Sequence, residues 1–152
     1  PYVGAPVTGR ASVLMVGLEE LLVESDFVTL HATATPETRH MINATRLALM
    51  KPNAFLINTA DASLVDQEAL VDTLRSKLIA GAALDVHESH PINPTTPLLT
   101  LDNVLLTPHI GGATDGTIER QSWRLVEDIG RFLKGKRPRR LVNPGMWRRR
   151  VR

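Results

Sequence analysis

The chain has 152 residues, of which 43% are hydrophobic, and it contains no cysteine. This length suits one domain with its own core, and the lack of cysteine excludes disulfides and thiolate-bound metals. No apolar run approaches the ~18 residues of a membrane span, and the first residues do not resemble a secretion signal. We therefore expect a cytoplasmic protein that does not contact membranes.

The net charge of +2 is unevenly distributed along the chain. From Lys136 to Arg152 there are eight basic residues and no acidic ones, whereas the rest of the chain has 10 basic and 16 acidic residues. A short basic run such as residues 148–150 can attract phosphates, but it is more often a solvated chain end. We therefore expect a basic, disordered tail over residues 145–152 and no nucleic-acid partner.

Helix and strand patterns alternate in the first part of the chain. Residues 16–26 place leucines at helical spacing, and residues 27–31 form a short apolar strand pattern. Asn43 is a suitable N-cap for a helix over residues 44–50. The next predicted strand covers residues 54–58.

The same alternation continues to residue 134. Asp66 is the expected N-cap of a helix over residues 67–77, and strands are predicted at residues 80–86 and 103–107. A long helix is predicted at residues 114–134, and Gly135 suits its C-cap. Its buried stripe is expected to contain Ile118, Leu125, Ile129 and Phe132, and Trp123 is also available to it. This order predicts a parallel sheet with helices on both faces.

Three apolar segments, at residues 50–60, 80–86 and 106–112, end in small or polar residues. Buried parallel strands that deliver a site at their carboxyl ends have this pattern. We therefore expect Ala60, Asp85 and His109 to meet at one rim of a single sheet. The nearby His87-Glu88-Ser89-His90 run lacks a supporting helix or third ligand, so no metal site is predicted.

The order and spacing of these segments resemble the NAD-binding domain of the D-isomer-specific 2-hydroxyacid dehydrogenases, the phosphoglycerate dehydrogenase-like group. The resemblance covers residues 1–144 and implies a doubly wound, Rossmann-like α/β domain. Only its second half is expected, because none of the ten glycines forms the Gly-x-Gly-x-x-Gly turn that binds pyrophosphate. Pro1 and Tyr2 resemble the two residues after the acidic ribose-binding residue of the family, so we expect the chain to begin inside a longer protein.

The resemblance also implies a function. The parent protein is expected to interconvert a 2-hydroxy acid and a 2-oxo acid by hydride transfer with NAD, NADP being left open, and to form a homodimer. His109 in the Thr-Pro-His-Ile-Gly-Gly segment matches the acid/base of the family, a role that imidazole suits. This chain alone is expected to be inactive. The residues expected at the cofactor are His31, Thr38, Thr59, Ala60, Asp61, Asp85, His109, Gly111 and Gly112.

Two expected catalytic positions have a different residue in this chain. His90 occupies the position of the glutamate that orients the histidine, and Glu88 is a candidate substitute. Asp61 occupies the position of the arginine that grips the substrate carboxylate. Two like charges 4 Å apart would cost about 4 kcal/mol at an effective dielectric constant near 20. Three interpretations stay open for Asp61: a loop aspartate that caps an amide, a site for an uncharged or cationic substrate, and a non-catalytic binding or scaffold relative.

Overall fold

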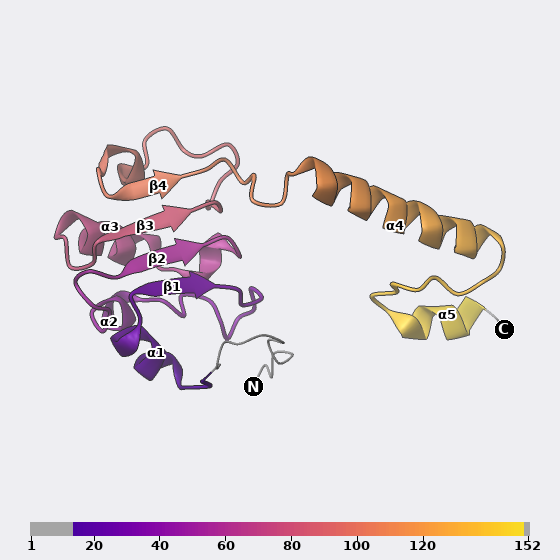
Figure 1. Ribbon diagram of the computed structural model, residues 1–152, viewed down its shortest axis with the longest axis horizontal. Helices are drawn as coiled ribbons and strands as arrows, with labels where there is room; N and C mark the ends of the chain where they lie inside the picture. Colours follow the sequence, from indigo (N-terminus) through magenta and orange to yellow (C-terminus); the bar gives the residue numbers. More distant parts are fainter. Residues whose placement is uncertain (1–13, 151–152) are drawn as a thin grey trace. The chain divides into compact units, whose positions relative to one another are not determined.

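The structure is a computed structural model that describes residues 14–150 (Figure 1). The chain divides into two compact units between His109 and Ile110. The first unit contains α1 (Leu18–Glu24), β1 (Phe27–Leu30), α2 (Ala44–Leu47), β2 (Phe55–Asn58), η1 (Ala62–Leu64), α3 (Gln67–Arg75), β3 (Gly81–Leu84), η2 (Pro97–Thr100) and β4 (Val104–Leu106). The second unit contains α4 (Asp115–Leu133) and α5 (Pro144–Arg150).

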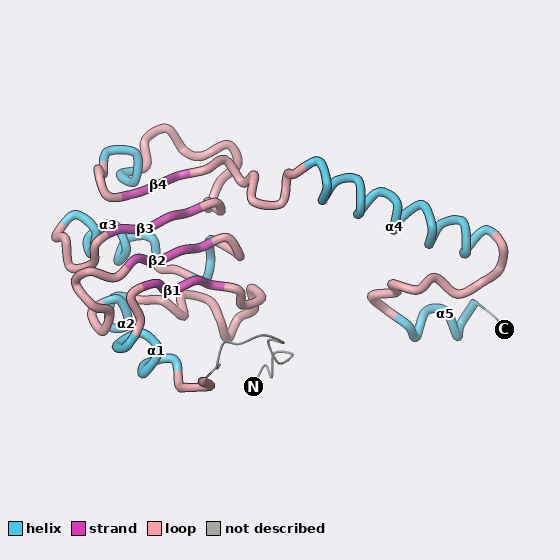
Figure 2. Tube along the Cα trace, in the orientation of Figure 1, coloured by secondary structure: helices cyan, strands magenta, loops and turns pink. Residues whose placement is uncertain are grey.

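The first unit is built on a parallel sheet with the strand order β1-β2-β3-β4, and Figure 2 shows helices and loops between successive strands. The register aligns Leu30 with Asn58, Asn58 with Leu84, and Leu84 with Leu106. All four strands therefore end at the same edge of the sheet. This confirms the predicted parallel, Rossmann-like α/β fold.

The core lies on one face of this sheet. Val28, Leu56 and Leu84 point into a cluster with helix residues such as Leu22 and Leu70, and all five are nearly inaccessible to solvent. Within the first unit the opposite face is exposed among the described residues, so this unit supplies the predicted covering helices on one face only. The reason is topological. Right-handed crossovers that all advance in one direction across a sheet place their helices on the same face, and a doubly wound sheet needs a reversal of strand order.

The predicted helix caps of the first unit are confirmed, although the elements are shorter than expected. The Asn43 side chain accepts a hydrogen bond from the Arg46 amide at 3.1 Å, and the Asp66 carboxylate accepts one from the Ala69 amide at 3.1 Å. Such caps satisfy amide groups that have no partner within the helix.

Thr114, the first residue of the predicted helix, is the N-cap of α4, and Gly135 follows the helix with a φ of +68°. The second unit by itself buries no residue of α4, so the predicted buried stripe stays a prediction. Ile118 and Leu125, for example, are 54% and 62% exposed. The apolar residues do recur at helical spacing, and the ring of Phe132 lies 6.4 Å from that of Trp147 in α5.

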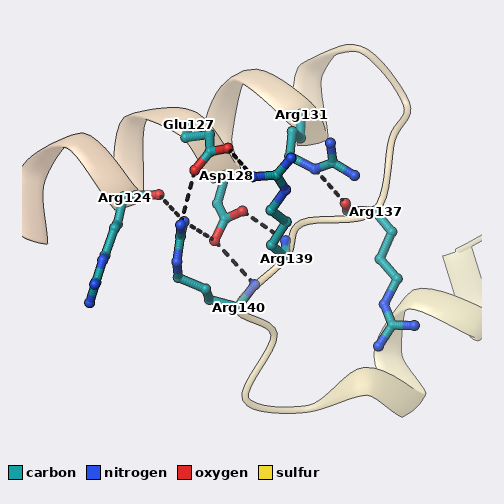
Figure 3. A network of polar contacts seen from close by, with 7 residues as sticks. All are labelled: Arg124, Glu127, Asp128, Arg131, Arg137, Arg139 and Arg140. Atoms are coloured by element: carbon teal, nitrogen blue, oxygen red, sulfur yellow. Dashed lines mark hydrogen bonds and ion pairs between the residues drawn. The ribbon is translucent and has the colours of Figure 1, made fainter.

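The basic segment after α4 folds back along the second unit, and Figure 3 shows its contacts. Arg139 and Arg140 both pair with Glu127, at 2.8 and 3.0 Å. The backbone amide of Arg139 also donates to the Asp128 carboxylate at 2.7 Å, and this bond is the main cause that lowers the pKa of Asp128. These arginines are therefore neutralised within the chain. Where a disordered tail was expected from residue 145, the structure has helix α5.

Candidate functional site

The turns after all four strands of the sheet line a cavity of about 430 Å³. Its lining consists of residues 39–40, residues 60–63, residues 86–88, His90 and His109. Asp85 lies at the same carboxyl edge, because its amide donates to the carbonyl oxygen of Asn58 at 3.0 Å. The expected meeting of Ala60, Asp85 and His109 at one rim therefore agrees with the geometry.

Asn58 holds the turn after β2 in place. Its side chain is almost fully buried, donates to the Asp61 carbonyl oxygen at 2.8 Å and accepts from the Ala60 amide at 3.1 Å. A buried amide side chain with both ends bonded fixes the path of the backbone around it. Asn58 thus sets where Ala60 and Asp61 enter the cavity.

Asp61 brings a negative charge to this cavity. Its Oδ1 accepts a hydrogen bond from the Ser63 hydroxyl at 2.6 Å and another from the Ser63 amide at 2.9 Å. The hydroxyl bond first, and the amide bond second, hold the pKa of Asp61 below the ordinary aspartate value. The carboxylate is therefore ionised at neutral pH while it also caps η1, so the capping role and a role toward ligand are compatible.

His109 and His90 both line the cavity, and their rings are in contact. Nδ1 of His109 lies 3.0 Å from Nε2 of His90, and the ring centroids are 5.0 Å apart at 45°. The φ of His109 is +56°, in the left-handed region. Non-glycine residues held there cost about 1–3 kcal/mol and cluster at functional sites. The backbone thus supports a functional interpretation of His109.

Glu88 makes a different contact. Its Oε2 accepts a hydrogen bond from the side chain of Gln67 at 3.4 Å, although Glu88 lines the same cavity. Nδ1 of His109, through which a partner would orient the ring, therefore faces His90 and not Glu88. A role of Glu88 as the substitute carboxylate would require a rearrangement of this loop.

Asp85 is buried at the end of β3 and is connected to β4. Its Oδ1 accepts a hydrogen bond from the Thr107 hydroxyl at 2.5 Å, and the His87 ring contacts the Thr107 carbonyl oxygen at 2.8 Å. These two contacts tie the loops after β3 and β4 together directly before His109. The sequence pattern indicated Asp85 as a site residue, but it did not indicate that Thr107 and His87 connect the two loops.

The remaining cofactor candidates lie in four places. His31 follows β1 at the same edge, with its Nε2 3.1 Å from the Thr29 hydroxyl. Thr38 donates to the Thr33 carbonyl oxygen at 2.7 Å and closes the next turn, and Thr59 is exposed at the end of β2. Gly111 and Gly112 belong to the second unit, so their predicted cofactor contacts stay predictions.

Two residues that the sequence reasoning missed also line the cavity. Arg39 is exposed, and His40 has a φ of +49°. Both follow Thr38 in the turn after β1, and the one signal in the sequence was their position beside that predicted turn. Arg39 adds a positive charge to a cavity that also contains Asp61.

Within residues 14–150, no group of three histidine or acidic side chains is placed to hold a metal ion. Over the same part of the chain, no helix has the length and apolar character needed to cross a bilayer.

Comparison with protein families assigns the first unit. Residues 5–111 match the family described as D-isomer specific 2-hydroxyacid dehydrogenase, NAD binding domain. The chain belongs to this family. The resemblance noted in the sequence is therefore confirmed, and the family consists of oxidoreductases with an NAD-binding domain.

Similar proteins of known sequence include a glyoxylate reductase from Korarchaeum cryptofilum, 48% identical over 128 residues, which are 84% of this chain and 39% of that protein. A D-3-phosphoglycerate dehydrogenase from Methanocaldococcus jannaschii is 40% identical over 144 residues, 94% of this chain and 27% of that protein. The chain thus spans well under half the length of these relatives.

Solved structures support the same assignment. A protein from Thermus thermophilus matches with a TM-score of 0.81 and 43% identity, over 88% of this chain and 44% of its own. A D-isomer specific 2-hydroxyacid dehydrogenase from Lactobacillus delbrueckii, in its NAD complex, has a TM-score of 0.76 and 33% identity, over 84% and 43%. An acyclic imino acid reductase with NADPH and D-Arg has a TM-score of 0.74 and 34% identity, over 80% and 39%.

Proposed function

We propose that the protein containing this chain is an NAD-dependent oxidoreductase that interconverts a 2-hydroxy acid and a 2-oxo acid. The observation that supports this most directly is the position of His109. Its ring enters a cavity at the carboxyl edge of the sheet, on a left-handed backbone, with its Nδ1 paired to His90. Ligands of open parallel sheets bind at this edge.

The residues at the ends of β3 and β4 fit the nicotinamide end of NAD. A carboxylate has about four acceptor sites, so Asp85 can accept from a carboxamide NH₂ group while it remains bonded to Thr107. His31, Thr38, Thr59 and Ala60 are the further candidates along the same edge. When bound, NAD would supply the acceptor for a hydride, and NADH would supply the hydride itself. NADP stays open as the alternative cofactor.

His109 would exchange the proton that accompanies the hydride. In reduction, the carbonyl carbon gains the hydride while its oxygen takes a proton from Nε2 of His109, so that the C=O π bond is replaced by C–H and O–H bonds. In oxidation, Nε2 takes the hydroxyl proton back. A positioned acid/base of this kind contributes about 10²- to 10⁴-fold to the rate.

The experiment for this function uses the full-length protein. It should be assayed with NADH and NADPH against a panel of 2-oxo acids. We expect a rate that falls at least about 100-fold in His109→Ala, whereas Ser89→Ala, a neighbouring change outside the proposed machinery, should stay close to the unchanged protein. Absence of activity in the unchanged protein would favour the non-catalytic binding or scaffold alternative.

Asp61 supports a second candidate substrate class. Its ionised carboxylate lies in the cavity at the position where the family places an arginine, so it opposes a substrate carboxylate and favours an uncharged or cationic group. The relative in complex with D-Arg is a reductase of imino acids. The assay panel should therefore include 2-oxo acids with a basic side chain, with and without an added amine.

The charge of Asp61 can be tested without removing its cap. Asn keeps an oxygen for the Ser63 amide, so Asp61→Asn removes the charge alone. We expect the KM for small anionic 2-oxo acids to fall about tenfold or more in Asp61→Asn, and further in Asp61→Arg, because repulsion of a few kcal/mol is removed. An unchanged KM in both variants would mean that Asp61 only caps η1.

We infer two further properties from the family resemblance and the composition. Homodimerisation and a cytoplasmic location are both expected, and light scattering and cell fractionation of the full-length protein would test them. The partial NAD-binding domain over residues 1–144 likewise stays a prediction.

A further inference from the structure

We propose that His90 positions His109 by fixing its tautomer, as a neutral hydrogen-bond acceptor in the place of a carboxylate. The inference rests on the function proposed above, because it concerns the group that would exchange the substrate proton. It assigns a role to the residue that departs from the family pattern.

The contact between the rings requires a hydrogen between them. Nδ1 of His109 and Nε2 of His90 are 3.0 Å apart, a normal N–H···N distance, and the rings are tilted by 45°. Two nitrogen lone pairs facing each other at this distance would repel, and two N–H groups would clash. One ring therefore donates and the other accepts.

His109 can both accept a proton from the substrate and return it only if its own ring is the donor of this hydrogen bond. If Nδ1 of His109 donates, its Nε2 can gain and lose a proton while the bond to His90 stays the same. If His90 donates instead, the neutral His109 ring already has its proton on Nε2 and cannot accept another there from a substrate hydroxyl. The productive arrangement thus has Nδ1–H on His109, and His90 neutral with its own proton on Nδ1.

The two carboxylates that line the cavity with the histidine pair are bonded to other residues, so His90 is the partner that can orient His109. Glu88, the nearby carboxylate, is bonded to Gln67, and Asp61 is bonded to Ser63. The backbone amide of His109 donates to the carbonyl oxygen of Thr107 at 3.0 Å, so the main chain holds the residue in place while His90 orients the ring. In other proteins such partners of a functional histidine set its tautomer and its direction.

The test reads the tautomer directly. The ring nitrogens of the 152-residue chain, labelled with ¹⁵N, are observed by long-range ¹H–¹⁵N correlation above pH ~8, where imidazoles are generally neutral. The five histidines are assigned by single substitutions. We expect His109 as the Nδ1–H tautomer in the unchanged chain and in His90→Gln, whose amide oxygen can accept the same bond. In His90→Leu we expect the Nε2–H tautomer.

Ser89→Ala is the matched control, because it alters the same loop without touching the pair. Its hydroxyl donates to the Pro91 carbonyl oxygen at 3.1 Å. The tautomer of His109 should not change in this variant. An Nε2–H tautomer in the unchanged chain, or an unchanged Nδ1–H tautomer in His90→Leu, would overturn the proposal.

Kinetics of the full-length protein separate this inference from the proposed function. We expect kcat to fall about tenfold or more in His90→Leu and to be largely restored in His90→Gln, with KM little changed. If the tautomer responds as expected but the protein has no oxidoreductase activity, the pairing of His90 with His109 stands and the proposed function is refuted. Full activity of His90→Leu, despite a changed tautomer, would refute the positioning role.

Discussion

Asp61 and Ser63 show how one short turn can hold a charge at the rim of a sheet. Both bonds from Ser63 favour the ionised carboxylate and lower its pKa. A carboxylate whose pKa is lower in the folded than in the unfolded chain stabilises the fold at pH values above its unfolded-state pKa. This stabilisation is lost as the pH falls through the pKa of the carboxylate in the folded chain.

Ser63→Ala should therefore destabilise the chain in a pH-dependent way. A hydrogen bond to a charged group contributes about 1.5–3 kcal/mol, and partial exposure reduces this to about 1 kcal/mol at pH 7. The difference should shrink toward zero as the pH falls below the ordinary aspartate range of about 4. Urea denaturation at pH 7 and at acid pH measures it. Ser89→Ala, which loses a bond to a carbonyl oxygen, should show no such pH dependence.

At the scale of elements, the close approach of strands depends on a residue without a side chain. A Cβ on Gly81, at the start of β3, would lie 2.6 Å from the Asn103 carbonyl oxygen and 3.1 Å from the Phe55 ring. Backbone cannot move out of the way without disturbing the β3–β4 pairing. Gly130, within α4, has nothing within 4 Å of the same position.

These two glycines should respond to alanine in opposite ways. Gly81→Ala should destabilise the chain by about 1–3 kcal/mol through overpacking, measured by urea denaturation. Gly130→Ala should increase helical content in circular dichroism, because alanine favours a helix interior by about 1 kcal/mol. Equal stability of Gly81→Ala and the unchanged chain would show that the strands can separate at this point.

At the scale of the whole molecule, the sheet face that the first unit leaves exposed is the surface that we expect to associate with other chains. Phe27 and Phe55 stack on it at 5.6 Å between centroids, and Phe27 and Leu105 are 67% and 64% exposed. These residues border an apolar hollow of about 450 Å³. Exposed apolar areas of this kind mark surfaces that associate with protein or aggregate.

We therefore expect the isolated chain to self-associate, and Phe27→Lys should reduce that association. Light scattering over a range of concentrations measures the effect. Leu78→Lys is the control, because Leu78 is also exposed, at 55%, but lies outside the strands. If both variants associate as strongly as the unchanged chain, the sheet face is not the surface responsible.

The sequence alone determined the order of elements, the caps at Asn43 and Asp66, and the residues at the strand ends. These features depend on interactions between residues close in the chain: apolar periodicity, capping bonds and the residue that follows each strand. The three segments that contain Ala60, Asp85 and His109 were therefore sufficient to indicate the family, and the site residues stay a prediction.

Only the tertiary structure decided which side chains meet across that site. His90 reaches His109 over 19 residues, and Glu88 reaches Gln67 over 21, through loops whose paths no local pattern specifies. The position of the first unit's helices on one face of the sheet was likewise decided by the direction of the crossovers between strands. Periodicity shows which residues of an element can be buried, whereas burial itself requires a second surface to pack against.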